Sequence, residues 1–317
     1  MTSYGFTLMT ELHGPRELVD QAVAAEAAGF DFAAMSDHFH PWLEAQGNAP
    51  FAWTVLGTVA ARTERMDLMT MVTCPFLRYH PAVVAQAAAT VQILSDGRFT
   101  LGVGAGENLN EHVIGAGWPA VPVRHEMLDE SIEIMRRLFQ GGEHHFRGEH
   151  LTLESARLYS LPDTPPPLAV AAGGPDAARL AGEAGDALIT VAPDPELIDA
   201  YREAGGTGPT YGQVGLSWAP DEEQGRKQAL ELFRFFSGGW PVMSELATPA
   251  AFEAATKTVR EEDVAELMPC GPQPELHVEA IRRFEEAGYD HVAVVQAGGD
   301  MNGFLRFWEE EVRPKLG

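Results

Sequence analysis

Short apolar segments alternate with helix-like segments along nearly the whole chain of 317 residues. Several of these apolar segments are uninterrupted, as expected for parallel strands that helices cover on both faces. Eight strand–helix units in a chain of this length favour a closed (β/α)₈ barrel, an α/β fold of the TIM-barrel type, over an open doubly wound sheet. The predicted strands lie at residues 4–9, 31–36, 67–73, 98–107, 167–174, 186–193, 210–219 and 290–296.

Helix-like patterns fill the intervals between these strands, and proline opens several of them at the first turn. The predicted helices lie at residues 15–30, 51–63, 81–97, 124–140, 175–185, 194–204, 221–236, 274–287 and 301–314. Two stretches interrupt the alternation: one near 141–165, with hairpin character over 143–155, and an irregular one over 238–271. The chain shows no internal repeat or linker, so we expect one barrel domain over residues 1–317 with these two insertions.

The charge of the chain is strongly acidic, with 46 Asp and Glu against 22 Lys and Arg and a net charge of -24. Such a field repels nucleic acid and anionic lipid, so we expect neither as a partner. The two cysteines, Cys74 and Cys270, cannot form a disulfide framework, which favours a reducing compartment. The sequence has no pattern typical of a signal peptide or of a membrane span, so we expect a cytoplasmic protein.

The reactive groups of (β/α)₈ barrels come from the loops after the C-terminal ends of the strands. After the second strand, His38 and His40 stand two residues apart, a spacing that would also suit half of a metal site. The ends of the fifth and sixth strands, AAGG and TVAP, add no metal ligands. We therefore assign no metal, keep a metal-dependent hydrolase as a remote alternative, and interpret His38 as an acid/base residue beside the aromatic Trp42.

Glycine-rich segments follow two further strands. Over 102–106, three glycines would let the backbone approach a flat or anionic ligand closely, and Glu107 behind them is a second candidate for proton transfer. This spacing differs from a dinucleotide-binding fingerprint. Gly173 and Gly174 open directly into a helix, which can form an anion site from N–H groups and the helix dipole, although the same pattern also serves for capping alone.

Three segments resemble one family: SDHFHPW (36–42), RYHPAVVAQAAATVQILSDGRFTLGVGAGENLNEHV (78–113) and AVAAGGPDAARLAGEAGDALI (169–189). They are similar to the luciferase-like monooxygenase superfamily and, within it, to the coenzyme F420-dependent oxidoreductases. The resemblance implies a (β/α)₈ barrel, usually a homodimer, that acts on a small-molecule substrate. It also implies that the deazaflavin cofactor lies at the C-terminal mouth of the barrel and exchanges a hydride at C5.

The resemblance also implies roles for individual residues. His38 would be the active-site acid/base and Glu107 the second proton-transfer residue near ring N1, while Trp42 would wall the substrate side and Glu11 would face the pocket. Which of His38 and Glu107 serves the substrate stays open at this point. A non-prolyl cis peptide is expected near Met71–Val72. The implied cofactor-binding residues are Asp37, Met71, Val72, Cys74, Ala105, Gly106, Asn110, Gly173, Gly174, Asp176 and Ala177.

One position departs from the pattern of the sugar-phosphate dehydrogenases in this family. They hold the substrate phosphate with basic residues, including a lysine shortly after the sixth strand, where this chain has Asp194. The nearby insertion supplies Arg260 but is mainly acidic. Because an aspartate would repel a phosphate, we expect a non-phosphorylated alcohol, carbonyl compound or activated alkene as substrate. The expected apolar walls are Phe51, Trp53 and Trp42.

Besides the remote metal-dependent hydrolase, two alternatives to an F420-dependent dehydrogenase or reductase remain. The first is an FMN-dependent monooxygenase of the same superfamily, which would use FMN in place of coenzyme F420. The second belongs to another class, a non-catalytic barrel that only sequesters the deazaflavin. A pure binding protein would have no use for a matched acid/base pair such as His38 and Glu107, which argues against this second alternative.

Overall fold

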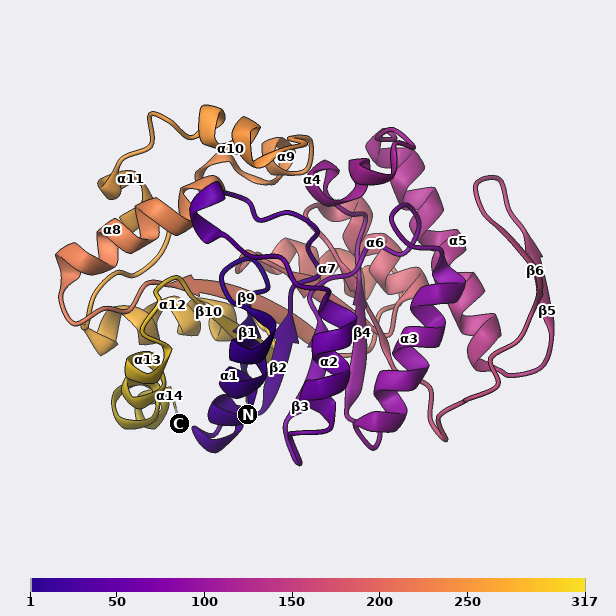
Figure 1. Cartoon of the computed structure of the whole chain (residues 1–317), viewed down its shortest axis with the longest axis horizontal. Helices are drawn as coiled ribbons and strands as arrows, with labels where there is room; N and C mark the ends of the chain where they lie inside the picture. Colours follow the sequence, from indigo (N-terminus) through magenta and orange to yellow (C-terminus); the bar gives the residue numbers. More distant parts are fainter. Residues whose placement is uncertain (1, 317) are drawn as a thin grey trace.

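The computed structural model of the chain describes residues 2–316. Eight parallel strands close into a barrel in the order β1-β10-β9-β8-β7-β4-β3-β2 (Figure 1). This confirms the predicted (β/α)₈ fold, and each strand lies within or close to its predicted range. The barrel strands are β1 (Ser3–Leu8), β2 (Phe32–Met35), β3 (Asp67–Thr70), β4 (Phe99–Val103), β7 (Leu168–Ala171), β8 (Ala187–Thr190), β9 (Thr210–Leu216) and β10 (His291–Gln296).

Helices surround the barrel, and several begin with proline in the first turn, where its missing N–H has no cost. Across residues 2–316, no helix combines the length and the apolar character that a membrane span requires. The surrounding helices are α1 (Pro15–Ala27), α2 (Ala52–Ala60), α3 (Pro81–Leu94), α5 (Val121–Phe139), α6 (Pro175–Ala184), α7 (Pro195–Glu203), α8 (Glu222–Phe233), α12 (Pro274–Glu286), and the C-terminal α13 (Met301–Phe307) and α14 (Arg313–Leu316).

The interior of the barrel is a packed core. Along β2, Phe32 and Ala34 belong to a cluster inside the barrel, whereas Ala33 and Met35 belong to the larger cluster between strands and helices. This alternation follows from the two-residue period of a strand. Met69, Ala169, Ile189 and other side chains complete the inner cluster. Since these side chains fill the barrel, open space for a ligand is expected only at its ends.

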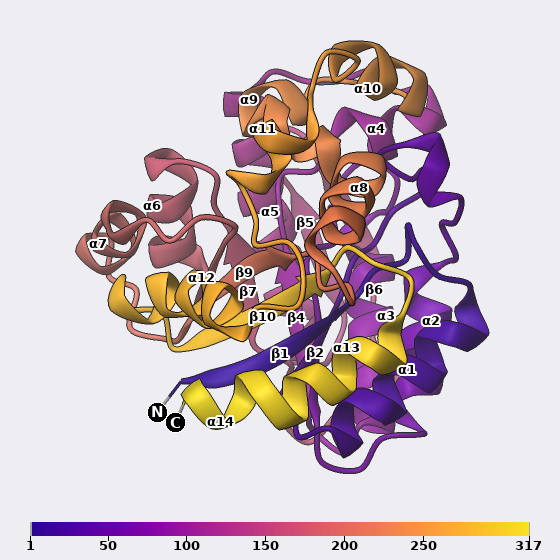
Figure 2. The same cartoon turned by 90° about the vertical axis from the view of Figure 1, so that its left-hand side faces the viewer.

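Two local structures occupy the stretches near 141–165 and over 238–271. The first is an antiparallel hairpin, β5 (His144–Arg147) and β6 (Thr152–Ala156), which projects from the side of the barrel (Figure 1). The second is more regular than expected, because it contains three short helices: α9 (Trp240–Met243), α10 (Pro249–Ala255) and α11 (Glu261–Ala265). Figure 2 shows these helices above the end of the barrel opposite to the chain termini.

Apolar contacts fix this second insertion to the barrel mouth. Trp42 and Leu43, from the loop after β2, share a buried cluster with Phe235, Met243 and Phe252. The insertion therefore forms one wall of whatever binds at the C-terminal ends of the strands.

Candidate active site

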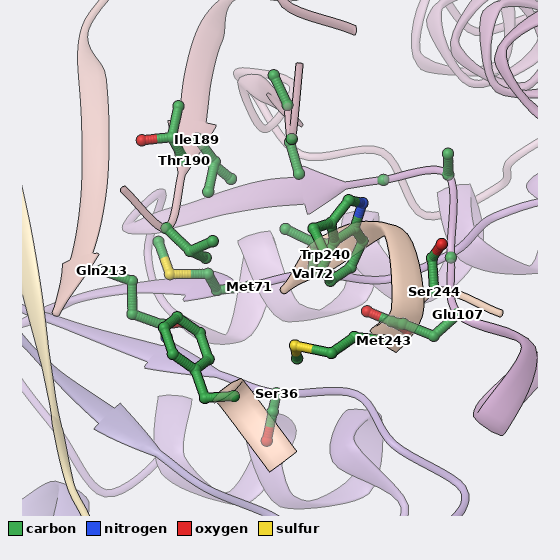
Figure 3. A pocket seen from close by; sticks show the side chains of 18 of the residues that line it. Ser36, Met71, Val72, Glu107, Ile189, Thr190, Gln213, Trp240, Met243 and Ser244 are labelled. Atoms are coloured by element: carbon green, nitrogen blue, oxygen red, sulfur yellow. The ribbon is translucent and has the colours of Figure 1, made fainter. Parts of the chain in front are cut away.

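A cavity of about 470 Å³ opens at the C-terminal ends of the barrel strands (Figure 3). This volume lies in the range typical of small-molecule sites. Of the predicted catalytic and cofactor-binding residues, only Asp37, Cys74 and Asn110 are absent from its walls. The predicted residues that line it are Glu11, His38, Trp42, Met71, Val72, Ala105, Gly106, Glu107, Gly173, Gly174, Asp176 and Ala177.

Glycines let the ends of β3 and β4 approach each other closely. A Cβ added at Gly104 would lie 2.7 Å from a methyl carbon of Val72, and one at Gly106 would lie 2.8 Å from the sulfur of Cys74. Gly106 also has a φ of 75°, which favours glycine. The peptide bond between Met71 and Val72 is cis, as the resemblance implies. Together these segments form a wall of mainly backbone atoms, which suits a flat ligand.

His38 is buried and makes two polar contacts. Its Nδ1 lies 3.1 Å from the main-chain oxygen of His40, and because a carbonyl only accepts hydrogen bonds, Nδ1 carries a proton. Its Nε2 faces the carboxylate of Glu11, with Oε1 3.5 Å away. Nε2 is therefore the ring nitrogen that can accept a proton, and the carboxylate of Glu11 lies where it would stabilise the protonated ring. Ser36 and Thr10 donate hydrogen bonds to the other oxygen of Glu11.

An aromatic stack lies beside this pair. The ring of Trp42 lies 4.9 Å from the ring of His38 and, at the same centroid distance, stacks on Phe235 with an interplanar angle of 4°. Phe252 meets Trp42 edge-on at 5.2 Å. The sequence analysis missed Phe235, which follows α8 about 190 residues beyond Trp42 and carries no local signal of a binding site.

Glu107 lies half-buried at the cavity wall, directly after the glycines of β4. Its carboxylate accepts a hydrogen bond from the side chain of Asn110 at 3.3 Å. The side-chain oxygen of Asn110 accepts from the main-chain N–H groups of Phe39 and His40. Asn110 thus joins the loop that carries His38 to the loop that carries Glu107. A direct contact of Asn110 with a cofactor stays a prediction.

Asp37 and Cys74 lie behind the cavity wall. The carboxylate of Asp37 accepts hydrogen bonds from Thr73, Arg78 and Tyr79. Burial, reinforced by the nearby carboxylate of Glu111, raises the pKa of the Cys74 thiol well above its ordinary value, so the thiol stays protonated and is a poor nucleophile. Cofactor contacts of Asp37 and Cys74 stay predictions.

The part of the cavity beside the start of α6 combines glycine backbone with a buried arginine. Gly173 and Gly174 precede α6, and Trp240 of the insertion lies against Gly173, since a Cβ added there would be 2.6 Å from its ring. Arg124 pairs with Glu245 at 2.9 Å, but its Nε is buried without a partner among the residues that the structure describes. The sequence analysis missed both Arg124 and Trp240. Figure 3 shows Trp240 reaching into the cavity from the insertion.

The structure corrects the argument from Asp194. Asp194 does not line the cavity; it caps the N-terminus of α7, and its carboxylate accepts a hydrogen bond from the main-chain N–H of Glu196 at 2.9 Å. Arg260 is exposed, pairs with Asp263 and also lies outside the cavity wall. Neither residue therefore faces a bound substrate, and Asp194 gives no reason to exclude a phosphate.

A further expectation, of an apolar wall formed by Phe51 and Trp53, is wrong. Phe51 and Trp53 do not wall the main cavity but line a second one, of about 430 Å³, on the outer side of α2 and α3. His40 does not join His38 at the cavity wall; its ring stacks on His112 and its Nδ1 contacts the main-chain oxygen of Leu109. Within residues 2–316, no group of three or more His, Cys, Asp and Glu side chains is arranged to hold a metal ion.

Comparison with known sequences points to one family. The sequence model of the luciferase-like monooxygenase family matches residues 2–291. The F420-dependent glucose-6-phosphate dehydrogenase of Microbacterium testaceum is 36% identical over 329 residues, covering 99% of this chain and 97% of that protein. The protein of the same name from Mycobacterium avium is 37% identical over 334 residues, covering 98% of this chain and 97% of its own.

Solved structures agree with this relationship. An F420-dependent secondary alcohol dehydrogenase in complex with an F420–acetone adduct has a TM-score of 0.91 at 31% identity, covering 100% of this chain and 99% of that chain. The coenzyme F420-dependent tetrahydromethanopterin reductase of Methanopyrus kandleri has a TM-score of 0.82 at 21% identity, covering 100% of this chain and 99% of that chain. The second likeness shows a shared fold alone.

Proposed function

The chain belongs to the luciferase-like monooxygenase family, in its branch of F420-dependent dehydrogenases, and we propose that it transfers a hydride between coenzyme F420 and a small, non-phosphorylated alcohol or carbonyl compound. The observation that carries this proposal is that His38, Glu11 and Glu107 line one cavity together with the glycine-rich wall. Hydride transfer to or from an alcohol needs such groups to move the accompanying protons.

The cavity fits coenzyme F420 in both shape and charge. The backbone wall around Gly104, Gly106 and the cis peptide after Met71 would support the flat deazaflavin. Gly173 and Gly174 before α6, together with the guanidinium group of Arg124, would hold the anionic tail. When bound, the cofactor supplies a ring carbon that accepts or donates the hydride.

The surroundings of the two acid/base groups suggest their roles. His38 lies against the apolar stack of Trp42 and Phe235, so we assign it to the substrate: it takes the hydroxyl proton of an alcohol, and Glu11 stabilises the protonated ring. Glu107 follows directly after the glycine wall, so we assign it to the ring nitrogen of the cofactor. In the direction of carbonyl reduction, both proton transfers reverse.

The substrate end of the cavity is apolar. Beside Trp42 and Phe235 it is lined by Met9, Met243 and Val295. No lysine is present among the described residues of the lining, and Arg124 belongs to the part of the cavity assigned to the cofactor tail. The lining has one histidine besides His38, which is His125. Burial lowers the pKa of His125 below its ordinary value, so this side chain is neutral at pH 7. A substrate phosphate would find no free cation at this end.

An assay of oxidised F420 absorbance with alternative substrates tests this proposal. We expect secondary alcohols such as 2-propanol or cyclohexanol to reduce the cofactor with a kcat/KM at least about 100-fold above that for glucose 6-phosphate, because the apolar wall contributes binding energy only to the former. Faster reduction by glucose 6-phosphate would contradict the substrate assignment. No reduction by any alcohol, with no oxidation of reduced F420 by the matching ketones, would contradict the reaction itself.

The outer cavity between α2 and α3 supports a homodimer. Phe51, Val83 and Leu94 line it, and each is roughly half exposed, which places large apolar side chains together on the surface. Such a patch is unusual on a monomer, so we propose that a second copy of the chain covers it. Light scattering should then give twice the chain mass of 34.4 kDa for the wild type, and Val83→Asp should shift it toward a monomer. A monomeric wild type at micromolar concentration would contradict this.

The two cysteines bear on the compartment. Cys74 and Cys270 are both free thiols in buried positions. We infer that the protein works in a reducing compartment, the cytoplasm, as its sequence leads us to expect. Cell fractionation followed by immunoblotting checks this, and recovery from a secreted fraction would contradict it.

A further inference from the structure

Three charged side chains form a buried row behind the wall of the active-site cavity. Arg78, from the segment between β3 and α3, lies between Asp37 on one side and Glu111 on the other. Each of the three side chains is less than one-tenth exposed. None of them lines the cavity, so none is placed to touch the substrate. A buried row of charges next to a catalytic loop needs an explanation, because burial of charge is costly unless it is paired.

Arg78 donates hydrogen bonds to Asp37, the residue that immediately precedes His38. One terminal nitrogen of its guanidinium group donates to the main-chain oxygen of Asp37 at 2.9 Å and to its carboxylate at 3.1 Å. That main-chain oxygen belongs to the peptide bond that joins Asp37 to His38. Arg78 therefore fixes the orientation of the peptide plane from which the His38 side chain departs.

Glu111 holds Arg78 from the other side. Its carboxylate accepts a hydrogen bond from the main-chain N–H of Arg78 at 2.8 Å and lies 3.6 Å from Nε of the same residue. Glu111 also lies under the glycine wall, since a Cβ added at Gly106 would be 3.2 Å from its Cγ. The row thus connects the backbone wall of the cavity to the loop that carries His38.

We propose that Arg78 is a positioning residue that sets the orientation of His38, and that Glu111 holds Arg78 in place for this task. The inference rests on the proposed function in that His38 is taken as the acid/base residue. Its physical basis is that proton transfer requires the donor and acceptor within hydrogen-bond reach, so a small rotation of the 37–38 peptide would move His38 away from Glu11 and from the substrate hydroxyl.

The charge of Glu111 makes this arrangement sensitive to pH. Burial raises the pKa of Glu111 to about 7, and the neighbouring carboxylates of Glu107 and Asp37 act in the same direction, whereas Arg78 opposes them. The remaining neighbours of Arg78 are the ring of Tyr79 and the protonated thiol of Cys74. Above neutral pH, Glu111 is therefore mostly ionised, and its ion pair with Arg78 is stronger than in acid.

Arg78→Lys is the first variant to measure, because lysine keeps the buried positive charge but lacks the planar fork of the guanidinium group. We expect kcat to fall by about tenfold while the dissociation constant of F420 changes by less than about threefold. In the His38→Ala background the same change should cost nothing further, because Arg78 acts through His38. Arg137→Lys, which alters an exposed ion pair with Glu133 on α5, is the matched control.

Hydrogen exchange gives a readout that needs no cofactor. Residues 36–42 should exchange about tenfold faster in Arg78→Lys than in the wild type, while the core of α5 stays unchanged. Unchanged exchange there would overturn the inference whether or not F420 binds. Normal exchange and turnover in Arg78→Lys, alongside an active wild type, would overturn the inference and leave the proposed function intact. A wild type that fails to bind F420 would instead contradict the proposed function.

Glu111→Gln provides a second and gentler variant. Glutamine retains an acceptor for the N–H of Arg78 but never carries a charge. The ratio of wild-type kcat to that of the variant should be close to one near about pH 6 and rise to about threefold or more near about pH 8, as Glu111 ionises in the wild type. Because other titrating groups affect both proteins equally, they cancel in the ratio. A ratio that does not change with pH would overturn the role of Glu111.

Discussion

Replacing His38 with alanine is expected to lower the turnover of an alcohol by at least about 100-fold, the usual scale for a lost general acid/base. Nε2 of His38 faces the carboxylate of Glu11, and the ring lies against Trp42 at the apolar end of the cavity. Alanine removes this proton acceptor but leaves the glycine wall and the anion end untouched. The dissociation constant of F420 should therefore stay within about tenfold of the wild-type value.

Stopped-flow measurement of oxidised F420 absorbance under single-turnover conditions checks this prediction. His145→Ala is the control, because His145 is mostly exposed on the β5–β6 hairpin, away from the cavity. Turnover like that of the wild type in His38→Ala would mean that another group takes the hydroxyl proton. Loss of F420 binding together with activity would mean that His38 serves the cofactor instead.

Replacing Glu107 with glutamine is expected to reduce turnover by about 100-fold as well. Glutamine can still accept the hydrogen bond from Asn110, so the contact between the two catalytic loops is retained. Glutamine cannot exchange a proton, so no side chain would then give or take the proton of the cofactor's ring nitrogen during hydride transfer. The loss should appear in kcat rather than in the KM of the alcohol, since Glu107 is assigned to the cofactor.

Steady-state kinetics with an aliphatic alcohol separates these two parameters. Glu143→Gln is the matched control, because Glu143 is exposed beside the hairpin and lies outside the cavity wall. A normal kcat in Glu107→Gln would contradict its role in proton transfer. A rise in KM with unchanged kcat would place Glu107 at the substrate end of the cavity.

The sequence was sufficient to predict the barrel and a part of the cavity wall. Strand–helix alternation fixes which loops lie at the C-terminal mouth, so His38, Glu107 and Gly173 could be placed together without coordinates. The cis peptide at Met71–Val72 was predicted from the resemblance alone. These features depend on local patterns or on a motif, which is why they could be read from one sequence.

Some of the other wall residues could not be predicted because long-range packing brings them to the cavity. Trp240 reaches the cavity because the second insertion folds over the barrel mouth, and Phe235 reaches it from the segment between α8 and that insertion; no local pattern encodes either contact. Arg124 lies in the first turn of a helix and has the spacing of an ordinary surface residue.

Asp194 is different, because a local signal was present. An aspartate directly before a proline that opens a helix is a typical N-cap, and this explains why its side chain turns toward the helix instead of the substrate. Phe51 and Trp53 stand at the start of α2, whose outer face is apolar, so their chemistry fits a surface contact as well as a substrate wall.

A fluorescence titration of the purified protein with oxidised F420 and, separately, with FMN tests the central claim most directly. The account predicts binding of F420 with a dissociation constant in the micromolar range or tighter, because the cavity offers both a backbone wall for the ring and an anion end. FMN should bind at least about 100-fold more weakly. Binding of FMN alone would contradict the account and favour a monooxygenase, which oxygen uptake would then reveal.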